Sequence, residues 1–209
     1  MKRRVAILIS GRGSNMQALV EAAKTPDFPV EIALVLSNRP DAAGLVWAEG
    51  QGITTAIVDH KLFKKDREAF EKAIQVELDK VHVEFVCLAG FMRLLTPWFI
   101  DQWYNRLINI HPSLLPSFKG LDTHARALEA GVKLHGCTVH FVRPDMDAGP
   151  IIAQKSVPVL DDDDPDSLAE RVLAVEHALY PHALAEIVRG LEGDLTIKDE
   201  RVIGIRPIG

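Results

Sequence analysis

The stretch Val5-Ala6-Ile7-Leu8-Ile9-Ser10-Gly11-Arg12-Gly13-Ser14-Asn15 opens the regular structure of the chain. Its five consecutive apolar residues are typical of a strand that is buried on both faces. The glycine-rich turn leads into a helix that we expect Ser14 or Asn15 to cap and that should end near Lys24. A strand, a glycine turn and a helix in this order predict the first part of a parallel α/β sheet.

The alternation of strands and helices continues to about residue 110. Apolar runs predict strands over residues 30–36, 53–58, 83–88 and 106–110. The segments between them predict helices over residues 42–51, 62–80 and 97–104. We therefore predict a Rossmann-like α/β fold, in which a mainly parallel twisted sheet carries helices on both faces.

Beyond residue 110 the pattern changes, and we expect an antiparallel carboxy-terminal part. A short helix is predicted over residues 123–130, and two extended runs over 136–142 and 150–159 are joined by a loop short enough for an antiparallel pair. A long helix should begin at Pro165, with Asp164 as its cap and a kink at Pro181, before a small strand pair within residues 193–208. Nothing in the sequence divides residues 1–209 into more than one domain.

The composition limits the class of protein. The chain has 209 residues, of which 47% are hydrophobic, and its net charge of −5 argues against general nucleic-acid binding. The first apolar run is too short for a signal peptide, and no run approaches the roughly 20 residues of a membrane span. Cys87 and Cys137 lie in apolar runs and are expected to be buried, reduced thiols. These features predict a cytoplasmic protein without membrane partners.

The turn over residues 10–15 is a candidate phosphate site. It places backbone N–H groups at the positive end of a helix, and Ser14 and Asn15 add side-chain donors. Met16 stands where the dinucleotide fingerprint needs its third glycine, so a monophosphate fits better than NAD. The alternative is a tight turn with a helix cap and no ligand.

The run Leu107-Ile108-Asn109-Ile110-His111-Pro112-Ser113-Leu114-Leu115-Pro116 is the candidate catalytic segment. Residues two apart on a strand point to the same side, so Asn109 and His111 should project together. An amide donor beside a histidine suits holding an oxyanion and moving a proton. Asp147, if the fold brings its turn close, would favour the charged form of His111, and His140 would support that network or simply pack. A hydrogen-bonded packing histidine is the alternative.

Two further segments have both a functional and a structural interpretation. Leu88-Ala89-Gly90-Phe91-Met92-Arg93-Leu94-Leu95 follows a buried strand, where ligands of parallel sheets collect, and suits a flat heteroaromatic ligand; a core loop is the alternative. The run Asp161-Asp162-Asp163-Asp164 is interpreted as a solvated loop with favourable charge at a helix start rather than as a cation site.

These motifs, together with Gly136-Cys137-Thr138-Val139-His140-Phe141-Val142 and Asp147-Ala148-Gly149-Pro150-Ile151-Ile152, occur in one order along residues 5–190. In that order the chain resembles the phosphoribosylglycinamide formyltransferase family, within the wider formyltransferase superfamily. The resemblance implies transfer of a formyl group from 10-formyltetrahydrofolate to the glycyl amine of glycinamide ribonucleotide, in purine synthesis, with folate as co-substrate and no metal.

The resemblance also assigns roles to residues of this chain. Asn109 and protonated His111 would stabilise the oxyanion, and Asp147 would keep His111 charged. The ribonucleotide would be bound by Gly13, Ser14, Asn15 and Glu176. The folate side would be lined by Arg67, Met92, Arg93, Leu94, Leu95, Asn109, Arg143, Pro144, Asp145, Met146 and Asp147. His140 would be a supporting residue.

Three other functions stay open at this point. A formyltetrahydrofolate deformylase resembles the same core, although it normally carries an additional amino-terminal domain, for which we expect no room before a strand that begins at residue 4. A metal hydrolase could use His111, His140 and Asp147 as ligands. A nucleotide-binding module without catalysis would leave the Asn109, His111 and Asp147 combination unexplained. The expected partners are small-molecule substrates, and a homodimer stays open.

Overall fold

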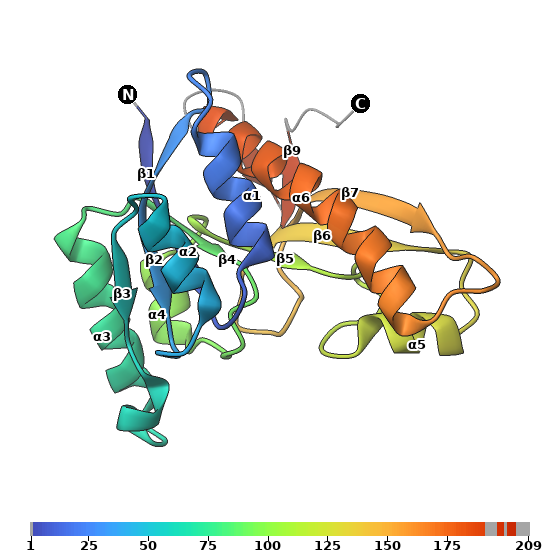
Figure 1. The fold of residues 1–209 in the computed structure, drawn as a ribbon, viewed down its shortest axis with the longest axis horizontal. Coiled ribbons are helices and arrows are strands. Elements are labelled where there is room, and N and C mark those ends of the chain that lie inside the picture. The colour runs from blue at the N-terminus through green and yellow to red at the C-terminus, as the bar shows by residue number, and fades with distance from the viewer. Residues whose placement is uncertain (1, 191–195, 199, 204–209) are drawn as a thin grey trace. The chain divides into compact units, whose positions relative to one another are not determined.

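The computed structural model describes residues 2–190, 196–198 and 200–203 (Figure 1). Seven strands form a mostly parallel sheet in the order β3-β2-β1-β4-β5-β6-β7, and β8 and β9 form a separate pair. The predicted α/β class with an antiparallel carboxy-terminal part is therefore confirmed. The chain divides into two compact units, Met1–Ile108 and Asn109–Gly209, and the assignment of a single domain stays a prediction.

The amino-terminal unit alternates strands and helices as its sequence predicts. Its elements are β1 (Arg3–Ile9), α1 (Ser14–Ala23), β2 (Val30–Ser37), α2 (Ala43–Gly50), β3 (Thr55–Ile57), the 3-10 helix η1 (His60–Phe63), α3 (Arg67–Lys80), β4 (Phe85–Leu88) and α4 (Pro97–Gln102). β1 pairs in parallel with both β2 and β4, and β2 pairs in parallel with β3. The apolar run of β1 is completely buried, as expected for a central strand.

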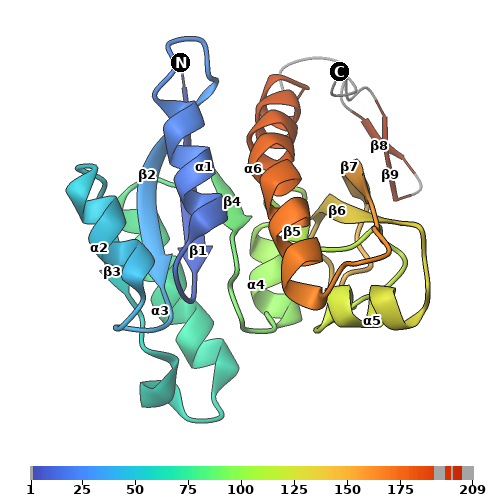
Figure 2. The same ribbon diagram turned by 45° about the vertical axis from the view of Figure 1, so that its right-hand side comes forward.

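The strand order places helices on both faces of this part of the sheet. The chain steps outward from β1 to β2 to β3 through α1 and α2, then returns past β1 to β4 through α3. Because such crossovers are right-handed, the outward and returning helices cover opposite faces. The contacts agree, since α1 packs against α2 whereas α3 packs against α4 (Figure 2).

The carboxy-terminal unit is built around an antiparallel pair. β5 (Leu107–His111) enters it, and its further elements are α5 (Thr123–Glu129), β6 (Leu134–Phe141), β7 (Ile151–Pro158), α6 (Pro165–Gly190), β8 (Thr196–Lys198) and β9 (Arg201–Ile203). β6 and β7 pair antiparallel, and α6 packs on both (Figure 2). A Cβ atom at Gly136 would lie 2.1 Å from the carbonyl oxygen of Lys155, so this close pairing needs a glycine.

Two helix starts differ from the prediction. Neither Ser14 nor Asn15 is the cap residue of α1, because Gly13 occupies that position in a left-handed conformation and has no side chain with which to cap the helix. The helix predicted over residues 62–80 is divided, because Lys64 has a positive φ of 52° and stops η1. α3 then begins anew behind Asp66, whose carboxylate accepts a hydrogen bond from the Ala69 N–H at 2.9 Å.

The end of the chain follows the prediction more closely. Asp164 caps α6 by accepting a hydrogen bond from the Ser167 N–H at 2.8 Å, and the helix continues through Pro181. The interpretation of Asp163 as a solvated residue is wrong, because its carboxylate accepts hydrogen bonds from Arg171 at 2.7 and 2.8 Å. β8 and β9 confirm the terminal pair, whereas residues 193–195, 199 and 204–208 of that prediction lie outside the described residues. In the described part of the chain, no helix has the length and apolar character needed to cross a bilayer.

Candidate active site

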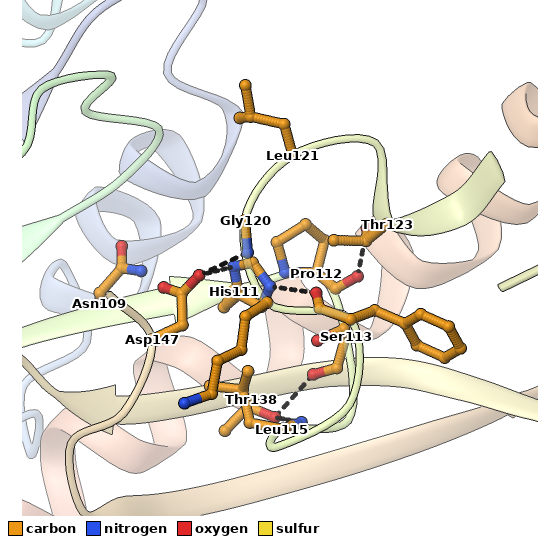
Figure 3. A network of polar contacts seen from close by, with 12 residues as sticks. Asn109, His111, Pro112, Ser113, Leu115, Gly120, Leu121, Thr123, Thr138 and Asp147 are labelled. Atoms are coloured by element: carbon orange, nitrogen blue, oxygen red, sulfur yellow. Dashed lines mark hydrogen bonds and ion pairs between the residues drawn. The ribbon is translucent and has the colours of Figure 1, made fainter. Parts of the chain in front are cut away.

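Asn109 and His111 lie at the carboxyl end of β5 and project to one side of it, as the alternation of a strand requires (Figure 3). His111 is buried, with 6% of its surface exposed, and Asn109 is half-buried. His111 is therefore fixed by its surroundings, whereas Asn109 keeps part of its surface open to solvent. The predicted pair exists as a pair in the carboxy-terminal unit.

Both ring nitrogens of His111 face oxygen acceptors. Nδ1 lies 3.4 Å from Oδ2 of Asp147, and Nε2 lies 3.0 Å from the carbonyl oxygen of Phe118 (Figure 3). A neutral imidazole has one N–H and would present a lone pair to one of these acceptors, whereas an imidazolium donates to both. Both acceptors can therefore be satisfied together only by an imidazolium.

Asp147 reaches His111 from the loop between β6 and β7. Its backbone is left-handed, with a φ of 49°, a conformation that aspartate tolerates better than most residues. Its Oδ2 also accepts a hydrogen bond from the Gly120 N–H at 2.9 Å. Gly149 makes this loop possible, because a Cβ atom there would lie 1.8 Å from the carbonyl oxygen of Phe141. The turn aspartate is thus half-buried and held from two sides.

His140 orients the amide of Asn109. Its Nδ1 lies 2.9 Å from the carbonyl oxygen of Phe141, so this nitrogen carries the proton. Burial lowers the pKa of His140 and keeps the ring neutral, although Asp147 lies 3.8 Å from its Nε2. Nε2 then accepts a hydrogen bond from Nδ2 of Asn109 at 3.3 Å, which leaves the second amide hydrogen for a ligand. This geometry supports the supporting role predicted for His140.

Side chains of β6 and β7 anchor the loop that follows His111. Thr138 donates to the carbonyl oxygen of Ser113 at 2.6 Å and accepts from the Leu115 N–H at 3.0 Å (Figure 3). Gln154 donates to the carbonyl oxygen of Leu115 at 2.8 Å. The anchored loop carries the backbone groups of Phe118 and Gly120 that contact His111 and Asp147. Sequence reasoning missed these two groups, because every residue has a backbone carbonyl and N–H.

The predicted phosphate turn lines a cavity of about 480 Å³ in the amino-terminal unit. Three sequence-predicted ribonucleotide residues and two sequence-predicted folate residues line it, and the full lining is Ser10, Gly11, Arg12, Gly13, Ser14, Asn15, Asn38, Arg39, His60, Ala89, Gly90, Met92 and Arg93. The first backbone N–H groups of α1 have no partner within the helix, and the helix dipole adds positive potential there. Such a cavity suits an anionic ligand.

Buried polar side chains join the strand ends around this cavity. The hydroxyl of Ser10 donates to Oδ1 of Asn38 at 2.5 Å and accepts from the Met92 N–H at 2.8 Å. The carbonyl oxygen of Asn38 lies 2.8 Å from Nδ1 of His60. Sequence reasoning also missed Asn38 and His60 as site residues, although the adjacent carboxyl ends of β1 and β2 were a usable signal.

Comparison with known proteins identifies the family. A model of the family described as formyl transferase matches residues 3–184. The chain belongs to the formyl transferase family. The phosphoribosylglycinamide formyltransferase of Escherichia coli strain K12 is 44% identical over 186 residues, which cover 89% of this chain and 87% of that protein.

Other relatives agree with this assignment. The trifunctional purine biosynthetic protein adenosine-3 of Homo sapiens is 49% identical over 90% of this formyl transferase, which spans only 19% of that protein. The crystal structure of phosphoribosylglycinamide formyltransferase from Brucella melitensis has a TM-score of 0.87 and 53% identity, covering 91% of this chain and 97% of that one. A formyltetrahydrofolate deformylase from Pseudomonas syringae is more distant, with 27% identity and a TM-score of 0.88 over 99% of this chain and 67% of that one.

The remaining predicted site residues of the formyl transferase lie in two places. In the amino-terminal unit, Arg67 donates to the carbonyl oxygen of Leu94, and the side chains of Met92 and Leu94 are exposed whereas that of Leu95 is buried. In the carboxy-terminal unit, residues 144–146 are exposed, and Arg143 forms an ion pair with Glu200 at 3.1 Å.

Glu176 is buried on α6 near Cys137, whose thiol pKa is raised to about 12 by burial and by the charge of Glu176. Both cysteines of the chain are buried thiols, as predicted. Among the described residues, no group of three or more histidine, cysteine or acidic side chains is arranged to hold a metal ion.

Proposed function

We propose that this formyl transferase moves the formyl group of 10-formyltetrahydrofolate to the glycyl amine of glycinamide ribonucleotide. The observation that carries the proposal is the buried His111–Asp147 pair beside the oriented amide of Asn109. Family membership, and the likeness to an Escherichia coli enzyme of that name over most of both chains, support the same reaction.

The proposed chemistry is acyl transfer through a tetrahedral intermediate. The glycyl nitrogen attacks the formyl carbon, and the carbonyl electron pair moves onto oxygen. The intermediate collapses as the bond to folate N10 breaks, N10 takes up a proton and the glycyl nitrogen loses one, through a water relay. The new C–N bond leaves a formylated ribonucleotide and tetrahydrofolate.

The residues of the site have separate tasks in this scheme. Asn109 donates its second amide hydrogen to the oxyanion, because His140 already holds the first. His111 supplies positive charge, and the acceptors on its two ring nitrogens keep that charge in place. Asp147 is the counter-charge that stabilises a buried imidazolium. Asn109 thus supplies the hydrogen bond to the oxyanion, and His111, supported by Asp147, supplies the positive charge.

We propose the binding roles on the same basis. The anion-binding cavity at Gly13, Ser14 and Asn15 would hold the ribonucleotide phosphate, and Glu176 would contact the same substrate. The folate would lie along Arg67, residues 92–95 and residues 143–147. The buried thiols Cys87 and Cys137 support a reducing compartment, and we propose the cytoplasm. A homodimer remains a proposal.

An assay with both substrates tests the function. Purified protein is incubated with 10-formyltetrahydrofolate, with and without glycinamide ribonucleotide, and both tetrahydrofolate and formylated ribonucleotide are measured. We expect tetrahydrofolate to form only when the ribonucleotide is present, in equal amount with the formylated product. Release of free formate without the ribonucleotide would instead identify a deformylase and reject the proposal.

A further inference from the structure

One face of α3 carries polar side chains that all bond to the chain segment between β4 and Trp103, the residue that follows α4. Arg67, Glu71 and Gln75 are spaced by four residues, so they lie in one row. Arg67 donates to the carbonyl oxygen of Leu94, and Gln75 accepts from the indole N–H of Trp103 at 2.9 Å. Glu71, between them, accepts from both the N–H and the hydroxyl of Thr96. The row therefore holds residues 94–103 at three points.

Glu71 is an unexpected member of this row because it is buried. Only 1% of its surface is exposed, and burial raises its pKa above the ordinary value of a glutamate. A buried carboxyl group is costly, and an apolar side chain of similar size is often the more stable choice. Both of its carboxylate oxygens accept hydrogen bonds from Thr96, and the bond from the Thr96 N–H is 2.7 Å long.

Thr96 also departs from the usual role of its position. It is the N-cap residue of α4, where a threonine hydroxyl ordinarily accepts a hydrogen bond from the helix end. Here the side chain makes no such bond, and the hydroxyl donates to Glu71 instead. The Thr96 side chain therefore does not cap α4, and a carboxyl group is buried beside it. Both features have the same result, which is that Thr96 is held in one position.

The backbone that is held in this way displays apolar side chains to solvent. Met92 and Leu94 are 69% and 63% exposed. Their backbone is nevertheless tied down, because the Met92 N–H bonds to Ser10 and the carbonyl oxygen of Leu94 accepts from Arg67. Exposed apolar side chains on a fixed backbone form a prepared surface for a flat ring, since little further ordering is needed when the ligand binds.

We propose that Glu71 is a positioning residue for the formyl donor, acting through Thr96 to fix residues 92–96 as the wall against which the pterin ring lies. The inference rests on the proposed function, which assigns the folate to residues 92–95. Glu71 does not touch the substrate in this proposal. Its effect should therefore appear in folate binding and spare the phosphate cavity, because Met92, at the border of that cavity, is held by the Ser10 hydroxyl and not by Glu71.

The experiment compares four single variants and the double variant of Glu71→Gln with Thr96→Val, all in the whole protein. Glu71→Gln replaces the carboxylate that accepts from the hydroxyl by a neutral amide, and Thr96→Val removes the hydroxyl itself, whereas Thr96→Ser keeps both donors of Thr96. Glu77→Gln is the matched control, because Glu77 lies on the same helix in an exposed ion pair with Lys80. For each protein, kcat and the separate KM values for the formyl donor and for glycinamide ribonucleotide are measured, and tetrahydrofolate is titrated by calorimetry. Thermal unfolding identifies the variants that are folded at the assay temperature.

We expect Glu71→Gln and Thr96→Val each to raise the folate KM and the tetrahydrofolate Kd about tenfold, equivalent to about 1.4 kcal/mol. The double variant should be no worse than either single variant, because both remove one interaction. The ribonucleotide KM should stay within about twofold, well below the tenfold effect on folate. Thr96→Ser and Glu77→Gln should behave as the unchanged protein.

Several results would overturn the inference. Equal losses for both substrates, a loss in kcat alone, or unchanged folate binding in folded Thr96→Val protein would each reject a role in folate positioning. Failure of the unchanged protein to formylate the ribonucleotide would reject the proposed function instead, and the tetrahydrofolate titration would still test the wall. No binding of tetrahydrofolate by the unchanged protein would reject both proposals.

Discussion

Replacing Asp147 by asparagine removes one charge and little else. Asparagine has nearly the same shape and also tolerates the left-handed backbone found there, with its φ of 49°. At the 3.4 Å separation of His111 Nδ1 and Asp147 Oδ2, and at an effective dielectric constant of about 20, two unit charges attract by about 5 kcal/mol. Both side chains are largely buried, so solvent screens little of this energy.

The expected loss of activity follows from this attraction. Removing one partner of a buried pair costs about 3 to 5 kcal/mol in comparable cases, because the remaining charge has no counter-charge. If the transition state needs the imidazolium, the turnover of Asp147→Asn should fall by about 100- to 5,000-fold. The loss should shrink as the pH is lowered, because a higher proton concentration replaces part of what the carboxylate did.

Formyl transfer is measured for both proteins between about pH 6 and about pH 9, at saturating concentrations of both substrates. Asp162→Asn, at an exposed aspartate of the same unit that has no assigned binding role, controls for a general loss of negative charge. A turnover that falls by less than about tenfold at about pH 8 would refute the argument that the charge pair drives the reaction. A large loss that does not change with pH would also refute it, since the defect would then not involve the proton of His111.

Three further predictions concern separate parts of the molecule. Asn109→Ala should lower kcat by about 100- to 1,000-fold with little change in the KM for either substrate, since an oxyanion donor acts in the transition state; near-normal turnover would contradict the role. Gly13→Val should raise the KM for the ribonucleotide and spare that for the folate, because Gly13 has a φ of 72° and a Cβ atom there would lie 2.8 Å from Cε of Met16; equal effects on both substrates would argue against the phosphate site. His135 should make the protein less stable in acid, because burial lowers its pKa to about 4 whereas the unfolded chain binds that proton near pH 6.5. The free energy of unfolding in urea should therefore decrease from about pH 6.5 to about pH 4, less steeply in His135→Gln, and an identical slope in both proteins would contradict this cause.

The elements of the fold were predictable because burial leaves a pattern in the sequence. The apolar run of β1 is a central strand with no exposed surface, and such runs rarely occur elsewhere. The alternation of a strand likewise predicted that Asn109 and His111 project together. The helix starts were less predictable, because the start of α1 depends on the left-handed Gly13 rather than on a capping side chain.

The sequence predicted which side chains come together in the candidate site. It did not predict which backbone groups contact them. The carbonyl oxygen of Phe118 and the N–H of Gly120 hold His111 and Asp147, and neither group depends on the identity of its side chain. The burial of Glu71 could not be predicted either, because on a charged amphipathic helix a glutamate ordinarily faces solvent. Its burial follows from the packing of α3 on α4, which only the tertiary structure reveals.

The turn over residues 10–15, which we propose as the phosphate site, has a consequence for inhibitors and for the mutations that would defeat them. A Cβ atom at Gly44, on α2, would lie 3.1 Å from the carbonyl oxygens of Gly11 and Arg12, and the Gly44 N–H bonds to that of Gly11. The backbone of α2 thus packs directly against the backbone of the turn. The hydrogen-bond donors at the amino-terminal end of α1 are main-chain N–H groups. An inhibitor that binds these N–H groups could be evaded only by a substitution that distorts the turn, such as Gly13→Val, and that substitution should weaken ribonucleotide binding as well. One that relies on the exposed Arg12 would lose affinity through a single codon change.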